Sequence, residues 1–277
     1  FSLVYDSEIL DAPLEILGRP IAKLTVSANA SRANWVVRIS DVAPDGQVTQ
    51  VAGAAFNGTH RISAREPIDI ILGEKFDLNI NLHFTSWVFP KGHKIRISIS
   101  NAQWPMLWPT IFNLESTLKI GGNSGARIEL PIVPSGKVYA PNFKKPSSSP
   151  SLAGYEVIDS GNITGYAAIN SIKYDPETKE AFGLASNTGA VRYPWGIERF
   201  EEEIEHRTSD ENPAYTSVIG RYRITEELKD RTLDFEQNVE FKSDEENFYL
   251  TFHRWVSVNG KLYKEKVWQE DIPRDFQ

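Results

Sequence analysis

The chain has 277 residues, of which 40% are hydrophobic and 24% are charged, and its formal net charge at pH 7 is −7. This length allows one large or two ordinary domains, each with a buried core. The negative charge argues against nucleic acid as a partner, because phosphate binding needs clustered Lys and Arg. No stretch approaches the roughly 20 apolar residues of a membrane span, so we expect no membrane partner. The lack of cysteine excludes disulfides and thiolate metal sites.

Two features of the first residues bear on the chain's origin. The segment Phe1-Ser2-Leu3-Val4 lacks the basic head of a signal peptide, which favours a cytoplasmic protein over a secreted one. The only methionine is Met106. We therefore expect that the natural chain does not start at Phe1 and that an N-terminal part is missing.

Short strands separated by turns are predicted along the first 140 residues. Residues 21–26 and 35–39 alternate, Pro44-Asp45-Gly46 supplies turn chemistry, and residues 48–56 give the next strand. Residues 68–72 form a short apolar run that we interpret as a strand. Residues 114–120 and 127–133 give two more.

The clearest pair of strands lies in the middle of this region. Phe76, Leu78, Ile80, Leu82 and Phe84 recur at a period of two, which predicts one half-buried strand with these side chains inward. After a turn at residues 90–92, a second run places isoleucines 95, 97 and 99 inward. Strands at this spacing with no helical period predict an all-β sandwich, best described as a jelly roll.

The same region resembles a known family in a long, ordered set of motifs. The matching residues are Leu3-Val4-Tyr5-Asp6-Ser7-Glu8, Leu14 to Pro20, Trp35 to Arg38, Asp41 to Gly46, Trp87, Phe89, Gly92 to Arg96, Ser98 to Ser100, and Trp104-Pro105 with Trp108-Pro109. This set is similar to the C-terminal β-domain of the cocaine esterase (CocE/NonD) and X-Pro dipeptidyl-peptidase family of serine hydrolases. The resemblance implies a galactose-binding-like jelly roll over residues 1–140.

A linker and a second β region are predicted after it. Residues 141–154 combine Pro, Ser and Gly with two lysines, which predicts a linker. Residues 155–277 predict an antiparallel β-meander that packs on the first domain. Its signals are a hairpin over residues 157–174 closed by Asp175-Pro176-Glu177-Thr178, alternation over 200–206, 233–241 and 248–256, and Asn259-Gly260, which favours a type I′ hairpin turn. We also expect a helical turn at residues 226–229.

Catalytic patterns are weak throughout the sequence. The nearest approach to a G-x-S-x-G nucleophile elbow is Gly122-Asn123-Ser124-Gly125-Ala126, which ends in alanine and leads into a strand. The run Glu201-Glu202-Glu203 with Glu205 is typical of a solvated strand face. We interpret all five histidines (60, 83, 93, 206 and 253) as structural or solvated. The sequence predicts no catalytic residue, no metal ligand and no cofactor.

Three tryptophans, Trp87, Trp104 and Trp108, are the candidate functional residues. Three interpretations stay open. They pack the corner of the sandwich, they form a face toward another domain of the same protein, or they form a platform for a sugar ring.

The resemblance implies that the chain is the non-catalytic C-terminal region of a serine hydrolase, either an acyl esterase or an X-Pro dipeptidyl-peptidase. In that family the catalytic Ser, Asp and His lie in an N-terminal α/β-hydrolase domain, which would be the chain's partner and is absent from this sequence. The β-domain packs on it and helps to enclose the active site. We therefore expect the chain alone to be inactive. The alternatives are a carbohydrate-binding jelly roll and an oligomerisation module that forms a homo-oligomer.

Overall fold

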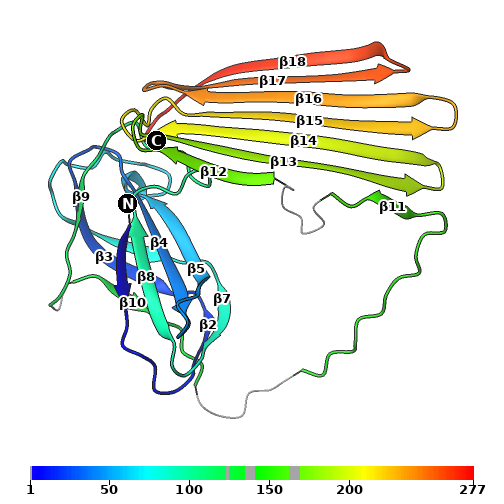
Figure 1. The fold of residues 1–277 in the computed structure, drawn as a ribbon. Helices are drawn as coiled ribbons and strands as arrows, with labels where there is room; N and C mark the ends of the chain where they lie inside the picture. Colours follow the sequence, from blue (N-terminus) through cyan, green and yellow to red (C-terminus); the bar gives the residue numbers. More distant parts are fainter. Residues whose placement is uncertain (1, 123–124, 135–140, 162–168) are drawn as a thin grey trace. The chain divides into compact units, whose positions relative to one another are not determined.

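The computed structural model describes residues 2–122, 125–134, 141–161 and 169–277. The chain divides into two compact units, residues 1–140 with Phe276–Gln277, and residues 141–275. Within the described residues both units consist of antiparallel strands, with one 3-10 turn, Gly58–His60, in the first (Figure 1). The described part of the chain contains no helix long and apolar enough to cross a membrane.

The described residues of the first unit form ten strands. They are β1 (Leu3–Asp6), β2 (Leu14–Gly18), β3 (Ile21–Ala28), β4 (Asn34–Val42), β5 (Val48–Asn57), β6 (Phe76–Asn81), β7 (Thr85–Phe89), β8 (Lys94–Ser100), β9 (Ser116–Leu118) and β10 (Arg127–Glu129). One sheet has the order β1-β8-β4-β5, and a second has the order β10-β3-β6 with β9 also paired to β3. Strands β2 and β7 form a two-stranded ribbon.

A single hydrophobic core lies between these sheets. Alternation directs Trp35, Val37 and Ile39 of β4 and Leu24 and Val26 of β3 into one buried cluster, which also contains residues of β6, β7 and β8. Trp35 packs edge-to-face on Phe76, with ring centroids 5.5 Å apart. The two main sheets therefore form the predicted sandwich, with the inward isoleucines 95, 97 and 99 of β8 on its inner face.

Two predictions for this unit are wrong. The predicted strand over residues 76–84 ends at Asn81, because β6 pairs with β3 only as far as Asn81 opposite Ile21, while β7 joins β2 in another ribbon. Phe84 lies in the connection and is 62% exposed. Residues 68–72 form a loop, in which Arg61 donates to the carbonyl oxygens of Ile68 and Asp69. The Arg61 side chain thus binds carbonyl groups that a neighbouring strand would bind in a sheet.

The second unit is an eight-stranded antiparallel sheet. Its strands are β11 (Glu156–Asp159), β12 (Ile169–Asp175), β13 (Glu180–Tyr193), β14 (Gly196–Ser209), β15 (Ser217–Leu228), β16 (Thr232–Ser243), β17 (Asn247–Val258) and β18 (Lys261–Pro273). The order is β11-β13-β14-β15-β16-β17-β18, and β12 also pairs with β13. Consecutive strands from β12 to β18 are neighbours, as in a meander (Figure 1).

The register separates this sheet into an apolar and a polar face. Ile204, Val239, Phe252 and Trp268 lie in one row across the sheet, and Phe200, Ile224, Phe235 and Val256 lie in another on the same face. The opposite face carries ion pairs, including Arg221–Glu203 at 2.7 Å and Arg223–Asp234 at 2.8 Å.

Turn chemistry in this unit matches the sequence pattern at two places. Asn259 and Gly260 have φ values of 51° and 75°, as a type I′ turn between β17 and β18 requires. The hairpin from β12 to β13 turns at residues 175–180, although its predicted members Ile163, Tyr166 and Ala168 lie outside the described residues. Residues 226–228 end strand β15, so the predicted helical turn there is wrong. The all-β sandwich followed by an antiparallel meander is confirmed.

Candidate functional site

A buried carboxylate connects two strands and a turn of the first unit. Asp41 lies on β4 and is 5% exposed. Its Oδ2 accepts a hydrogen bond of 3.1 Å from the indole N–H of Trp87 on β7, and its Oδ1 lies 2.8 Å from Nδ1 of His93 in the turn before β8. Both oxygens of a buried carboxylate are thus bound, which a buried charge requires.

The hydrogen bonds of this cluster have a structural role. A histidine paired with an aspartate also occurs in a serine-hydrolase triad, where the second ring nitrogen must reach a serine hydroxyl. Among the described residues, the hydrogen bond found for the His93 ring is the one to Asp41. Asp41 therefore fixes the β7 strand and the turn before β8 to β4. The candidate residue Trp87 is half-buried: its ring packs against the hydrophobic core, while its N–H donates to Asp41.

Trp104 and Trp108 meet in the loop that follows β8. Their rings pack edge-to-face, with centroids 5.2 Å apart and planes at 85°. Both are half-buried, whereas Met106 between them is 81% exposed. The loop closes on itself through the bond from the Leu107 N–H to the Gln103 carbonyl at 2.9 Å. A rigid aromatic pair thus presents one apolar side chain to solvent. The two ring planes are close to perpendicular, so the pair does not form a platform of two coplanar rings.

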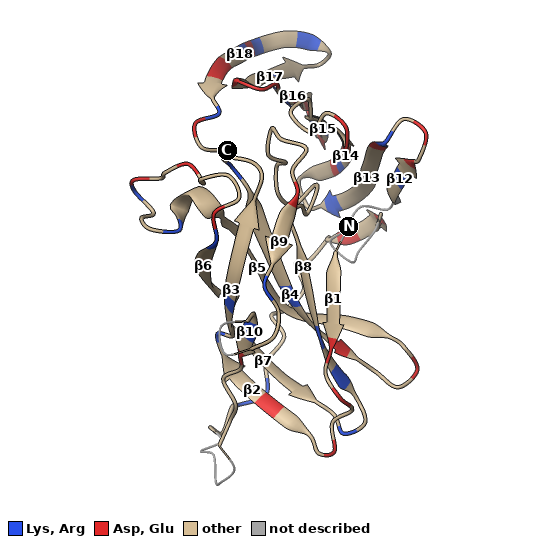
Figure 2. Ribbon diagram, turned by 90° about the vertical axis from the view of Figure 1, so that its left-hand side faces the viewer, with Lys and Arg blue, Asp and Glu red and all other residues tan. Residues whose placement is uncertain are grey.

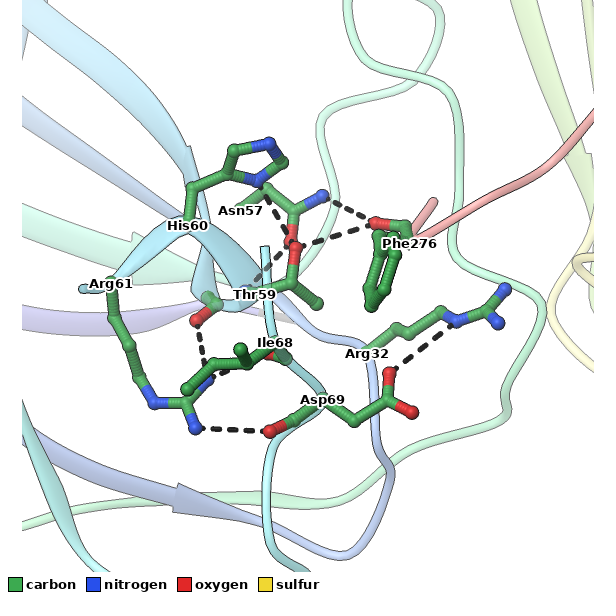
Figure 3. A network of polar contacts seen from close by, with 9 residues as sticks. Arg32, Asn57, Thr59, His60, Arg61, Ile68, Asp69 and Phe276 are labelled. Carbon is green, nitrogen blue, oxygen red and sulfur yellow. Dashed lines mark hydrogen bonds and ion pairs between the residues drawn. The ribbon is translucent and has the colours of Figure 1, made fainter. Parts of the chain in front are cut away.

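A second polar network follows β5 and holds the end of the chain (Figure 3). The Asn57 side-chain amide donates to the Phe276 carbonyl at 2.8 Å, while its Oδ1 accepts from the Thr59 N–H and Oγ1. Thr59 is fully buried. This places Phe276 in the first unit, together with the loop that Arg61 binds.

Each unit has a hollow of several hundred Å³ among its described residues. One, of about 440 Å³, opens between the sheets of the sandwich and is lined mainly by apolar residues of β8, β3, β9 and β10, with Asp6 and Arg127 also on its wall. The Arg96 guanidinium, 2.7 Å from the Asp6 carboxylate, lowers the pKa of Asp6. The other, of about 550 Å³, lies over the polar face of the second unit. It includes Glu201, Glu203, Arg221 and Trp255.

The remaining acidic and histidine residues lie in strand or turn contexts. The Glu201–Glu203 run belongs to β14, and Glu203 pairs with Arg221. His253 on β17 lies 3.3 Å from Glu265, and burial lowers the pKa of His206. Ser124 lies outside the described residues. Within the described ranges no three His, Cys, Asp or Glu residues gather as metal ligands would.

Sequence reasoning did not single out Asp41, Asn57, Arg61 or Phe276 as structural centres. The sequence nonetheless contains a signal that could have identified Asp41. It belongs to the same motif set as Trp87 and His93, and a charged residue inside an alternating apolar strand signals a buried partner. The roles of Asn57 and Phe276 depend on a contact across 219 positions, which no local pattern encodes.

Residues 2–126 match the family model described as the X-Pro dipeptidyl-peptidase C-terminal non-catalytic domain. The chain is also similar to cocaine esterase from Rhodococcus sp. (strain MB1 Bresler), with 31% identity over 103 residues. That match covers 37% of this chain and 18% of the esterase. The chain thus spans only a small part of the curated relative it matches.

Two solved structures match about half of the chain. An α-amino acid ester hydrolase matches with a TM-score of 0.45 and 22% identity, covering 48% of this chain and 25% of that one. An aminopeptidase from the marine sediment archaeon Thaumarchaeota archaeon matches with a TM-score of 0.45 and 23% identity, covering 48% and 26%.

Proposed function

We propose that the chain is the C-terminal region of a CocE/NonD-type serine hydrolase, because residues 2–126 match the model of the X-Pro dipeptidyl-peptidase C-terminal non-catalytic domain. The family match is the observation that carries this proposal, and it confirms the resemblance predicted from the sequence. The catalytic Ser, Asp and His would belong to an α/β-hydrolase domain of the longer protein. That domain would cleave an ester or an Xaa-Pro amide through an acyl-enzyme and an oxyanion hole.

The role of the chain in that protein is to pack on the catalytic domain and help enclose its active site. The loop of Trp104 and Trp108 supports a contact of this kind, because exposed apolar side chains on a rigid support are typical of interfaces. Met106 is the most exposed of these side chains at 81%. The division into a sandwich domain (1–140), a linker (141–154) and a β region (155–277) that packs on the sandwich belongs to the same proposal.

Activity assays test the non-catalytic assignment. The 277-residue chain should show no turnover of p-nitrophenyl acetate or of an Xaa-Pro p-nitroanilide, whereas a protein that includes the upstream α/β-hydrolase domain should cleave one of them. The coding region upstream of Phe1 should carry G-x-S-x-G followed by an Asp and a His. Turnover by the chain alone that a serine-reactive inhibitor abolishes would contradict the proposal.

The single methionine offers a direct test of the docking loop. With ¹³C-methyl methionine the chain should give one Met methyl signal, from Met106. Adding the hydrolase domain should shift or broaden that signal. Met106→Glu should weaken the association, while Ile62→Glu, at another exposed apolar position (75%), should not. An unchanged methyl signal in a bound complex would exclude this loop as the contact.

A further inference from the structure

The last strand of the second unit leaves a long edge open. Strand β18 ends the strand order of its sheet, and β17 is its paired neighbour among the described residues. Every residue of this 13-residue strand except Trp268 is exposed. At the other side of the sheet, β13 is covered by two short strands, β11 with 4 residues and β12 with 7. Proteins usually shorten or cover strand edges, because an open edge pairs readily with another chain.

Apolar side chains mark this edge as a contact surface. Leu262 is 57% exposed, Tyr263 76%, Val267 51% and Ile272 40%. Four large hydrophobic side chains on one exposed strand exceed the scattered apolar residues that are usual on a soluble surface. These side chains therefore favour a partner surface that is itself partly apolar.

The charges of β18 are divided between its two halves. The first half holds Lys261, Lys264 and Lys266 with Glu265 and is net basic, whereas the second half holds Glu270 and Asp271 and is acidic (Figure 2). Val267 separates the two groups. An antiparallel copy of the same strand would place the basic half beside the acidic half, so the strand is complementary to itself.

We propose that β18 pairs antiparallel with β18 of a second copy of this chain, about a two-fold axis at Val267. In that register Lys264 lies opposite the partner's Glu270, and Lys266 lies opposite the partner's Trp268. Each contact occurs twice because the axis repeats it. Lys266 already lies 4.4 Å from the centroid of its own Trp268 ring, so the indole face suits an ammonium group. The inference is independent of the proposed function.

The side-chain faces restrict the register. Antiparallel pairs centred on a residue join positions of the same face, whereas pairs centred between residues would join the apolar face of one copy to the polar face of the other. Centring on Lys266 would set that lysine against itself. Centring the pair on Trp268 would set Glu265 opposite Asp271 of the copy, so that two negative charges would face each other. The register about Val267 sets Glu265 against Gln269 and places no like charges directly opposite each other.

This pairing extends the apolar face across both copies. The row from Ile204 through Val239 and Phe252 ends at Trp268 on β18. Phe252 and Trp268 stack with centroids 5.4 Å apart. Beside the second copy this row would continue through the partner's Lys266 into the row of that copy that contains Arg254, Gln237 and Tyr222 on the same face. The result is one continuous sheet built from two chains.

Light scattering on the chain at several concentrations tests the association. The mass should approach twice 31.2 kDa as the concentration rises. Val267→Lys places two ammonium groups opposite each other and should return the mass to that of one chain. Val48→Lys, at an exposed position (47%) on the β5 edge of the first unit, is the matched control and should leave the mass unchanged. A single-chain mass for the unmodified protein at all concentrations would overturn the proposal.

Charge exchange tests the register and does not depend on whether Val267→Lys folds. Lys264→Glu alone and Glu270→Lys alone should each weaken the dimer, because like charges then face each other. The double variant should restore it. A double variant that stays as weak as the single variants would overturn the antiparallel pairing about Val267.

Cross-linking gives an independent readout, because the chain has no other cysteine. In the proposed register Val267→Cys faces its own copy and should form a disulfide-linked dimer under mild oxidation. Glu265→Cys lies about 13 Å along the strands from its copy and should not. Equal cross-linking of both variants would contradict the register.

Discussion

The indole N–H of Trp87 donates to the buried carboxylate of Asp41 across 46 positions of sequence. These two residues and His93 belong to the motif set that carries the resemblance to the hydrolase family, and the structure brings all three together. Residues that mark the family here hold the corner of the sandwich together. A motif that suggested a binding face from sequence thus has a structural explanation in this unit.

Trp87→Phe should lower the free energy of unfolding by about 1–2 kcal/mol, because it removes one donor from a buried carboxylate and keeps most of the ring. Urea unfolding of the whole chain measures the change. Trp195→Phe is the matched control, since Trp195 is 61% exposed and its stacking on Tyr193 survives in phenylalanine. Equal effects of the two substitutions would show that the Asp41 bond contributes little.

Gly58→Ala should destabilise the first unit by about 1–3 kcal/mol, as overpacking of a core does. An added Cβ would collide with Cζ3 of Trp35 and lie 3.0 Å from Cδ1 of Ile70. Trp35 and Ile70 are both 1% exposed, so neither side chain can move into solvent. Combining Gly58→Ala with Trp35→Phe should cost less than the sum of the two single changes. Strict additivity in urea unfolding would exclude the collision.

Asn57→Asp should loosen the end of the chain while it preserves the turn after β5. The aspartate keeps the Oδ1 acceptor for Thr59 but loses the donor to the Phe276 carbonyl. Amide hydrogen exchange at residues 276–277 should therefore become faster. Exchange at Thr59 should be little changed. Asn57→Ala should affect both sites, and protection of Phe276 in either variant at the wild-type level would contradict this role.

Acid should weaken the second unit through Asp234. Hydrogen bonds from Arg223 and Thr225 hold the pKa of this carboxyl below its ordinary value of 3.8. The ionised form therefore stabilises the folded state above pH 3.8, and that stability is lost as the pH falls through the lower folded-state pKa. Urea unfolding between pH 6 and pH 3 should show a steeper loss for the wild type than for Asp234→Asn. Identical slopes would rule out this contribution.

The sequence predicted the second unit's hairpins better than the ends of its strands. Asn259-Gly260 and Asp175-Pro176 specify their turns locally, so pattern alone placed them. Strand length depends on the neighbour. Strand β15 continues through Glu226 because its backbone pairs with Leu233 of β16, which outweighs any helical preference of residues 226–229.

The errors in the first unit have the same origin. Phe84 fits the alternation of β6, yet it lies beyond the last residue of that strand to pair with β3. Ile70 is buried, but Arg61 binds the carbonyls of Ile68 and Asp69 just before it, so the segment forms a loop and not the predicted strand. Long-range contacts decided both cases.

The bond between Asn57 and Phe276 also determines how the chain would carry mechanical load. Residues 141–275 lie between two attachments to the first unit, one through Ala140 and one through Phe276. A force applied between Phe1 and Gln277 would therefore act first on the first unit and on the Asn57–Phe276 hydrogen bond. The β-meander would bear tension only after that hydrogen bond broke. Force-extension traces should show a short, early rupture before the longer extension of the second unit.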